Sequence, residues 1–156
     1  MLRYPGLHFR EIQRRLSLAN GVLEYHLRTL TKSGIIESER DGQFVRFYPT
    51  STAHEDRTLI SILRQPRLRK IITFLILRPR SDYKAIVQDL KPSIPTISWH
   101  IKRLEQLGVI RREKSLDGLT YFEVANTQEV TRILSTYKLS FLDKTVESFL
   151  DTWENL

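Results

Sequence analysis

The chain carries one pattern of residues twice, 74 positions apart. The passages NGVLEYHLRTLTKSGIIESERDGQFVRF and PTISWHIKRLEQLGVIRREKSLDGLTYF illustrate it, and the copies align without a gap from Phe9/Tyr83 to Ile36/Ile110. Identical residues coincide at several of the aligned positions: Ile12/Ile86, Leu16/Leu90, His26/His100, Leu30/Leu104 and Gly34/Gly108. A chain of 156 residues suffices for one ordinary domain or two very small ones, so the repeat predicts two small units of the same fold.

Each copy begins with a short helix. In the first copy, Phe9, Ile12 and Leu16 place apolar side chains at helical spacing over residues 9–16. In the second copy we expect Ser81 to act as the N-cap of the helix. Asp82 is then expected to interact favourably with the positive end of the helix dipole.

A turn at residues 17–21 or 91–95 leads to a longer helix with one apolar stripe. The stripe consists of Leu23, Leu27 and Leu30 in the first copy and of Ile97, Ile101 and Leu104 in the second. Gly34 and Gly108 stand where a helix ends in a left-handed residue, a conformation that glycine adopts without steric cost. The spacing therefore predicts that both longer helices end in the same way.

Two strands with a tight turn follow each longer helix. Residues 35–40 and 43–48 alternate in polarity around Asp41-Gly42, and residues 110–114 and 119–124 do so around Asp117-Gly118. Helix, turn, helix and hairpin is the order of a winged helix-turn-helix. The predicted fold class is therefore mainly α with small β-hairpin wings: two tandem winged helix-turn-helix units plus C-terminal helices.

The stretch GLHFREIQRRLSLANGVLEYHLRTLTKSGIIES resembles archaeal winged helix-turn-helix regulators related to the ArsR/MarR-like superfamily. The pattern YHL..L...G.I, from Tyr25 to Ile36, carries the resemblance, which covers roughly residues 5–126. Many members of this group have two such units in tandem. The resemblance implies a transcription regulator that binds DNA and dimerises through its terminal helices.

The expected organisation has four segments. Residues 1–52 form the first winged unit, 53–65 a connecting helix or linker, 66–126 the second winged unit, and 127–156 a C-terminal helical dimerisation tail. The second unit has a leading helix over residues 68–77, after Pro66, whereas the first unit has only MLRY before Pro5. Its leading helix is absent or truncated, so either a helix at residues 56–63 or a partner chain is expected to fill the gap.

The residues expected to touch DNA lie on the longer helices, opposite the apolar stripe, and on the wings. A helix with its side chains is about 10–12 Å wide and enters the major groove, while a hairpin reaches the flanking backbone. The helix candidates are Asn20, Glu24, Tyr25, Arg28, Lys32, Thr96, Ser98, Trp99, Lys102 and Arg103, and the wing candidates are Arg40, Arg46, Arg111, Arg112 and Lys114. The helix after Pro66 adds Arg67, Arg69 and Lys70. We expect the second unit to make the main contact, because the carboxylate of Glu24 repels phosphates.

Two residue types at equivalent positions allow more than one role. Tyr25 and Trp99 are expected to pack against the wing or the preceding helix, with stacking on a sugar or base as the alternative. His26 and His100 are expected to pack or to contact phosphate. No metal site is expected, because the other two histidines are isolated and the chain has no cysteine.

The composition favours a polyanionic partner. The formal net charge is +7, distributed as +3 over residues 1–50, +6 over residues 51–126 and −2 over residues 127–156. The absence of cysteine excludes disulfides and thiolate chemistry. Since neither a signal peptide nor a bilayer-spanning apolar run is visible, a cytoplasmic location is expected.

The tail has a large apolar stripe that must be buried. It is expected to mediate homodimerisation through Phe141, Leu142, Val146, Phe149, Leu150 and Trp153. These features together predict a sequence-specific regulator that binds double-stranded DNA as a homodimer. The alternatives are a protein-interaction module of the transcription machinery and a non-specific, chromatin-like binder. No catalytic arrangement and no cofactor site are visible, so neither an enzyme nor a bound cofactor is expected.

Overall fold

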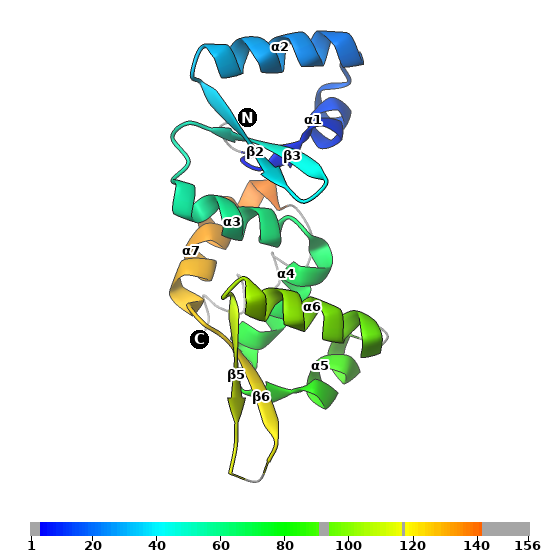
Figure 1. The fold of residues 1–156 in the computed structure, drawn as a ribbon, viewed down its shortest axis with the longest axis vertical. Coiled ribbons are helices and arrows are strands. Elements are labelled where there is room, and N and C mark those ends of the chain that lie inside the picture. The colour runs from blue at the N-terminus through cyan, green and yellow to red at the C-terminus, as the bar shows by residue number, and fades with distance from the viewer. Residues whose placement is uncertain (1–3, 91–93, 117, 142–156) are drawn as a thin grey trace. The chain divides into compact units, whose positions relative to one another are not determined.

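The computed structural model describes residues 4–90, 94–116 and 118–141 of the chain. The chain divides into two compact units between Arg64 and Gln65. Each unit contains a helix-turn-helix pair and a small three-stranded antiparallel sheet (Figure 1). The predicted fold class, mainly α with small β wings, is confirmed. No helix of the described residues is long and apolar enough to cross a membrane.

The first unit consists of β1 (Leu7–His8), α1 (Phe9–Leu16), α2 (Asn20–Lys32), β2 (Ile36–Asp41), β3 (Phe44–Pro49) and α3 (His54–Leu63). Its sheet has the strand order β1-β3-β2. The two-residue strand β1 pairs with β3 and joins the start of α1 to the wing. The sequence pattern does not reveal this strand, because two residues show no periodicity.

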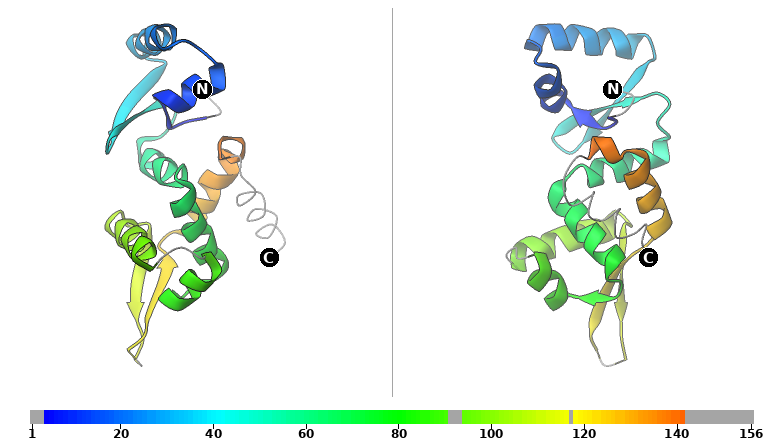
Figure 2. Two further views of the ribbon diagram at one scale, coloured as in Figure 1. Left: turned by 90° about the vertical axis from the view of Figure 1, so that its right-hand side faces the viewer. Right: turned by 180° about the vertical axis from the view of Figure 1, so that it is seen from behind.

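The second unit consists of α4 (Pro66–Leu77), β4 (Ser81–Asp82), α5 (Tyr83–Leu90), α6 (Ile94–Gln106), β5 (Ile110–Lys114), β6 (Thr120–Val124), α7 (Thr127–Thr136) and the 3₁₀ helix η1 (Lys138–Ser140). Its sheet repeats the order of the first, as β4-β6-β5. Figure 2 shows from two further sides that the β5–β6 hairpin projects from this unit as a wing.

The core of the first unit lies between its helix-turn-helix pair and its sheet. The buried residues are Leu7, Ile12, Leu23, Leu27 and Ile36, with Tyr4, Phe9, Leu18, Leu30 and Phe47 packed around them. Leu16, expected in this core, is 55% exposed. It is the last residue of the eight-residue α1, and Ser17 then turns the chain with a φ of +52°, so Leu16 extends past the edge of the core.

Both longer helices end as predicted, in a left-handed glycine. Gly34 has a φ of +66° and Gly108 a φ of +70°. The amide after each glycine donates to a carbonyl five residues earlier, Ile35 to Leu30 and Val109 to Leu104. This bond is that of a Schellman motif, and it satisfies a carbonyl that the helix end would leave open. Ile35 therefore belongs to the helix end, and β2 begins one residue later than predicted.

The short helix of the second unit is capped by a different residue from the one predicted. The amide of Ala85 donates to Asp82 Oδ1 at 2.8 Å, so Asp82 is the N-cap. The hydroxyl of Ser81 instead donates to the Arg78 carbonyl at 2.7 Å. Ser81 and Asp82 form β4, so Asp82, as the last residue before the helix, is the one in position to cap it.

Helix α3 packs on the sheet of the first unit. Arg64, which follows the helix, donates from Nε to the Pro5 carbonyl at 2.6 Å, and Tyr48 on β3 donates to the Arg57 carbonyl at 3.3 Å. Arg57 also forms an ion pair with Glu37 on β2 at 2.7 Å. Burial raises the pKa of Tyr48 to about 12, so its hydroxyl remains a donor at neutral pH. The first unit therefore extends beyond residue 52 and includes the helix expected to connect the two units.

Candidate nucleic-acid interface

Helix α2 exposes the predicted contact residues of the first unit. Leu23 and Leu27 are buried, while Asn20, Glu24, Tyr25, Arg28 and Lys32 are all exposed. Arg28 forms an ion pair with Glu24 one turn earlier, at 3.4 Å. The Glu24 charge is therefore partly balanced on the helix itself, which weakens the repulsion of phosphates expected from the sequence.

Helix α6 has the same division into a buried and an exposed face. Its stripe of Ile97, Ile101 and Leu104 is at most 1% exposed, and the face on the other side presents Ser98, Trp99 and Lys102. Thr96 is half-buried. Hydroxyl, aromatic and ammonium groups thus point outward together on a helix that the core fixes on its other side.

Arg103 differs from its neighbour Lys102. It is half-buried, and its guanidinium donates to the side-chain oxygen of Gln65 at 3.2 Å. The guanidinium carbon also lies 5.5 Å from the centre of the Trp99 ring, within the range of a cation–π contact. Arg103 therefore holds Trp99 and the start of α4 in place, and Lys102 is the more accessible of the two cations.

The aromatic residue at the equivalent position of each longer helix is exposed. Tyr25 is 67% and Trp99 58% exposed, so the expected packing of these rings against the wing or the preceding helix is wrong. Each ring makes an edge contact with the histidine that follows it. Arg103 lies over one face of the Trp99 ring, so stacking on a sugar or base would use the exposed remainder of that ring and the exposed Tyr25 ring.

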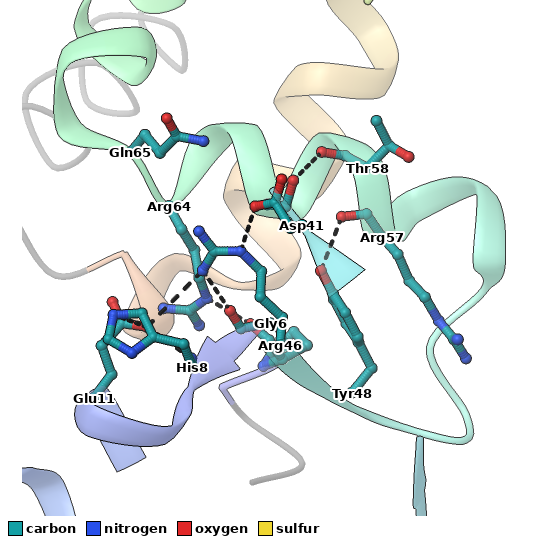
Figure 3. Close-up of polar contacts among 12 residues, drawn as sticks. Gly6, His8, Glu11, Asp41, Arg46, Tyr48, Arg57, Thr58, Arg64 and Gln65 are labelled. Atoms are coloured by element: carbon teal, nitrogen blue, oxygen red, sulfur yellow. Dashed lines mark hydrogen bonds and ion pairs between the residues drawn. The ribbon is translucent and has the colours of Figure 1, made fainter. Parts of the chain in front are cut away.

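Arg46 is not available on the first wing. Its Nε donates to Asp41 Oδ2 at 2.6 Å and one terminal nitrogen to the Gly6 carbonyl at 2.9 Å, with Glu11 at 3.9 Å from the same nitrogen (Figure 3). The residue is 4% exposed. It therefore fixes the wing to the start of the chain and cannot reach DNA, which corrects its prediction as a contact residue. Arg40, on the neighbouring strand, is exposed.

The arginines of the second wing are exposed but already paired. Arg111 Nε lies 2.5 Å from Glu123, and Arg112 donates two bonds of 2.9 Å to the carboxylate of Glu105 on α6. The bonds to Glu105 raise the pKa of Arg112. The Arg112–Glu105 pair connects the wing to α6, whereas the Arg111–Glu123 pair joins the two strands of the wing. Lys114, near the tip, is exposed, and no carboxylate partner is found for it among the described residues.

The three cations of α4, the first helix of the second unit, differ in exposure. Arg67 and Lys70 are exposed, whereas Arg69 is 4% exposed and lies 5.8 Å from the centre of the Phe141 ring. Arg69 is therefore part of the interior of the second unit, which corrects its prediction as a contact residue.

His26 and His100 align in the sequence but differ in surroundings. His26 is exposed, while His100 is 9% exposed and neither of its ring nitrogens finds a hydrogen-bond partner among the described residues. Burial lowers the pKa of His100, and the charges of Arg67 and Arg103 lower it further. His100 is therefore a neutral packing residue at neutral pH. Within the described part of the chain, no three His, Cys, Asp or Glu side chains gather as metal ligands would.

Two features of the helix-turn-helix pairs were not predicted. An open, mainly apolar groove of about 520 Å³ lies between α5 and α6, lined by Tyr83, Lys84, Val87, Gln88 and Ser98. Helix α1 carries Arg10, Arg14 and Arg15, all exposed. The signal for the arginines is present in the sequence as FREIQRRL, in which three of eight residues are cations. The groove has no such signal, because it depends on how two helices pack.

Comparisons with known proteins agree with this geometry. Residues 2–60 match a family described as an N-terminal HTH domain, and residues 64–111 match a family described as winged helix-turn-helix DNA-binding. An uncharacterized HTH-type transcriptional regulator of Methanocaldococcus jannaschii is 28% identical over 122 residues, which are 78% of this chain and 31% of that relative. The chain thus spans less than a third of the relative's length. It contains two helix-turn-helix domains, the second of the winged DNA-binding type, and it is related in sequence to an archaeal HTH-type transcriptional regulator.

Proposed function

We propose that the chain binds double-stranded DNA in a sequence-specific manner and regulates transcription as a homodimer. The observation that carries the proposal is the outward face of α6, where Ser98, Trp99 and Lys102 are exposed on a helix whose opposite face is buried. A surface helix in a winged helix-turn-helix unit is the element that enters the major groove.

The chemistry of this face suits base edges and the DNA backbone. Lys102 can donate to the guanine edge, and the Ser98 hydroxyl can bond to a base or a phosphate. Trp99 offers a flat apolar surface for a thymine methyl or a sugar, and Arg103 limits its rotation through the contact described above. Because Arg103 is held by Gln65, we assign it to positioning Trp99 rather than to reading a base.

Two units in one chain support a long recognition site. A single unit offers only a few base contacts, and a second unit on the same chain binds at a high effective concentration once the first is bound. The duplication therefore raises both affinity and specificity without requiring new contacts within either unit. Regulation of transcription is inferred from the proposed sequence-specific binding of DNA and from the related archaeal regulator.

Homodimerisation is the second part of the proposal. Six residues are predicted to form the dimer contact. One of them, Phe141, is 4% exposed and lies against Arg69 of its own chain, so we do not assign it to this contact. Leu142, Val146, Phe149, Leu150 and Trp153 lie outside the described residues, and their apolar spacing in the sequence still supports the proposal. Light scattering on the purified chain is expected to give the mass of two copies, and Phe149→Glu/Trp153→Glu the mass of one. A wild-type mass of one copy would remove the dimer from the proposal.

The proposal includes neither a catalytic residue nor a cofactor. The residues assigned above act by hydrogen bonding, stacking and charge, and none of them needs a bound group to do so. Location in the cytoplasm follows from the proposed contact with the genome and belongs to the same proposal.

Selection of bound duplexes from a random library tests the proposed reading. The wild-type chain is expected to enrich a consensus, and Trp99→Ala/Lys102→Ala to lose the part of it read by α6. Thr136→Ala/Lys138→Ala, at exposed positions at the end of α7 and in η1, serves as the control and is expected to keep the whole consensus. Failure of the folded wild-type chain to enrich any duplex would contradict the proposal and favour a protein-interaction module. Equal binding of unrelated duplexes would favour a non-specific binder.

A further inference from the structure

Helix α1 presents a strip of positive charge to solvent. Arg10 and Arg14 are one helical turn apart, so they lie on one face, and both are exposed. Ile12, which is 2% exposed, anchors the opposite face in the core. Arg15 is also exposed, but its guanidinium carbon lies 4.4 Å from the centre of the Tyr4 ring and so belongs to another side of the helix.

The guanidinium groups of Arg10 and Arg14 form no ion pair within the described part of the chain. Within residues 4–90, 94–116 and 118–141, neither side chain has a carboxylate partner; Arg14 makes only one long bond, of 3.4 Å, to the Arg10 carbonyl. Several other exposed arginines are paired, Arg28 with Glu24, Arg78 with Asp89 and Arg80 with Glu113, whereas Arg10 and Arg14 are two cations without a carboxylate partner among these residues on one short helix. Two adjacent unpaired guanidinium groups repel each other, which costs stability unless a ligand supplies negative charge.

The repeat provides an internal comparison for this strip. The second copy has Lys84, Gln88 and Asp89 where the first has Arg10, Arg14 and Arg15, and Asp89 pairs with Arg78. The same short helix is therefore built in the second unit with no net charge at these three positions. The fold does not require the arginines, so their presence in the first unit calls for another explanation.

The strip lies next to the start of the longer helix. Gln13, between the two arginines in sequence, donates from its side-chain amide to the Leu18 carbonyl at 3.1 Å and to the Asn20 side chain. Asn20 is the first residue of α2, and Figure 1 shows α1 beside that end of the helix. In a helix-turn-helix, the first helix crosses the DNA backbone while the second occupies the groove. Arg10 and Arg14 are thus on the helix expected to face phosphates.

We infer that α1 of the first unit is a phosphate-binding surface for duplex DNA, with Arg10 and Arg14 as its contact residues. The inference rests on the proposed function and assigns the first unit a contact of its own. Guanidinium groups bind phosphate oxygens through paired hydrogen bonds, which suits two arginines one turn apart. This contact carries affinity, while sequence preference resides in the longer helices.

The test is the salt dependence of duplex binding by the whole chain. Fluorescence anisotropy with a labelled duplex of arbitrary sequence, between about 50 and 200 mM salt, gives the slope of log K against log salt concentration. Arg10→Gln/Arg14→Gln is expected to make the slope shallower by about 2, at about 0.9 for each phosphate that the variant does not neutralise. Affinity at about 0.1 M salt should fall on the order of tenfold for each arginine replaced.

The matched control is Arg132→Gln/Lys138→Gln, which removes the same charge from exposed positions on α7 and η1. It is expected to keep the wild-type slope, and thermal unfolding checks that both variants are folded. If Arg10→Gln/Arg14→Gln kept the wild-type salt slope, or if the control changed the slope equally, the inference about α1 would be overturned. The proposed function would not be affected by that result. Absence of duplex binding by the wild-type chain at any salt concentration would overturn the proposed function itself.

Discussion

Gly34 and Gly108 set the direction in which each chain segment leaves its longer helix. Both adopt a left-handed conformation, and an added Cβ would meet no atom within 4 Å at either position. Glycine is therefore required at these positions for its backbone conformation, and not because neighbouring atoms would crowd a side chain. L-residues other than glycine adopt this conformation at a cost of about 1–2 kcal/mol.

Substitution at this position is predicted to destabilise the first unit. We expect Gly34→Ala to lower the free energy of unfolding by about 1–2 kcal/mol, measured by denaturant unfolding. Gly21→Ala is the control, because Gly21 lies in the first turn of α2 with no positive φ and nothing within 4 Å of an added Cβ. There alanine should stabilise by about 0.5–1 kcal/mol. Equal effects of the two substitutions would contradict the conformational explanation.

His100 is predicted to make the stability of the second unit depend on pH. Its pKa is lowered in the folded chain by burial and by Arg67 and Arg103, so the unfolded chain binds its proton more tightly. The neutral ring therefore contributes full stability above the unfolded pKa of about 6.5. That contribution is lost as the pH falls below this value toward the lowered folded pKa.

Thermal unfolding between about pH 5 and pH 8 measures the dependence. The wild-type unfolding temperature is expected to fall with decreasing pH more steeply than that of His100→Phe, which keeps an aromatic ring but cannot be protonated. Parallel pH profiles of the two proteins would show that His100 does not carry the effect.

Among the structural elements, the first wing is held by one buried cation. Arg46 links the β2–β3 hairpin to the carbonyl of Gly6, 40 residues earlier in the chain, and to Asp41 at the tip. Burial of Arg64, which bonds to the neighbouring Pro5 carbonyl, lowers its pKa to about 10, so it is still charged at neutral pH. The two arginines together fasten the residues before β1 to the rest of the first unit.

Removing this cation is predicted to destabilise the first unit strongly. Breaking a buried ion pair costs about 3–5 kcal/mol, and since Asp41 and Glu11 are partly exposed we expect about 2–3 kcal/mol for Arg46→Met. Arg40→Met, at an exposed position of the same hairpin, should stay within about 0.5 kcal/mol. Calorimetric unfolding measures both. A small effect of Arg46→Met would place Arg46 among the accessible cations of the wing.

Local patterns in the sequence were sufficient to predict most elements. The apolar spacing of Leu23 and Leu27, the glycine at 34 and the Asp41-Gly42 turn each depend on residues close in the chain, and each gave the right element. The accessibility of Arg46 was not predictable in this way, because its partner Gly6 is distant in sequence. The predicted packing of Tyr25 and Trp99 was wrong because the exposure of a side chain depends on how distant elements pack around it. The apolar spacing in α1 likewise predicted a buried Leu16, which is exposed.

Across the whole molecule, affinity and specificity are assigned to different units. Arginines on α1 of the first unit are inferred to bind phosphates, and the outward face of α6 is proposed to read bases. Because α1 and α6 belong to separate units, the effects of substitutions on the two helices are expected to add in the free energy of binding.

Substitutions on α1 and on α6 are therefore predicted to affect different properties of DNA binding. Arg10→Gln/Arg14→Gln should weaken binding to every duplex alike and keep the consensus. Trp99→Ala/Lys102→Ala should change the consensus and should flatten the salt slope by at most about 1, for the single cation removed. Selection and salt titration of both variants check this. A change of consensus in the arginine variant would contradict the division.

Sequence-specific recognition of DNA is tested most simply by comparing two duplexes at one salt concentration. The dissociation constant of the wild-type chain is measured for a duplex selected from the random library and for a scrambled duplex of equal length and composition. We expect the selected duplex to bind at least about a thousandfold more tightly. Equal dissociation constants would contradict sequence-specific DNA recognition by this chain.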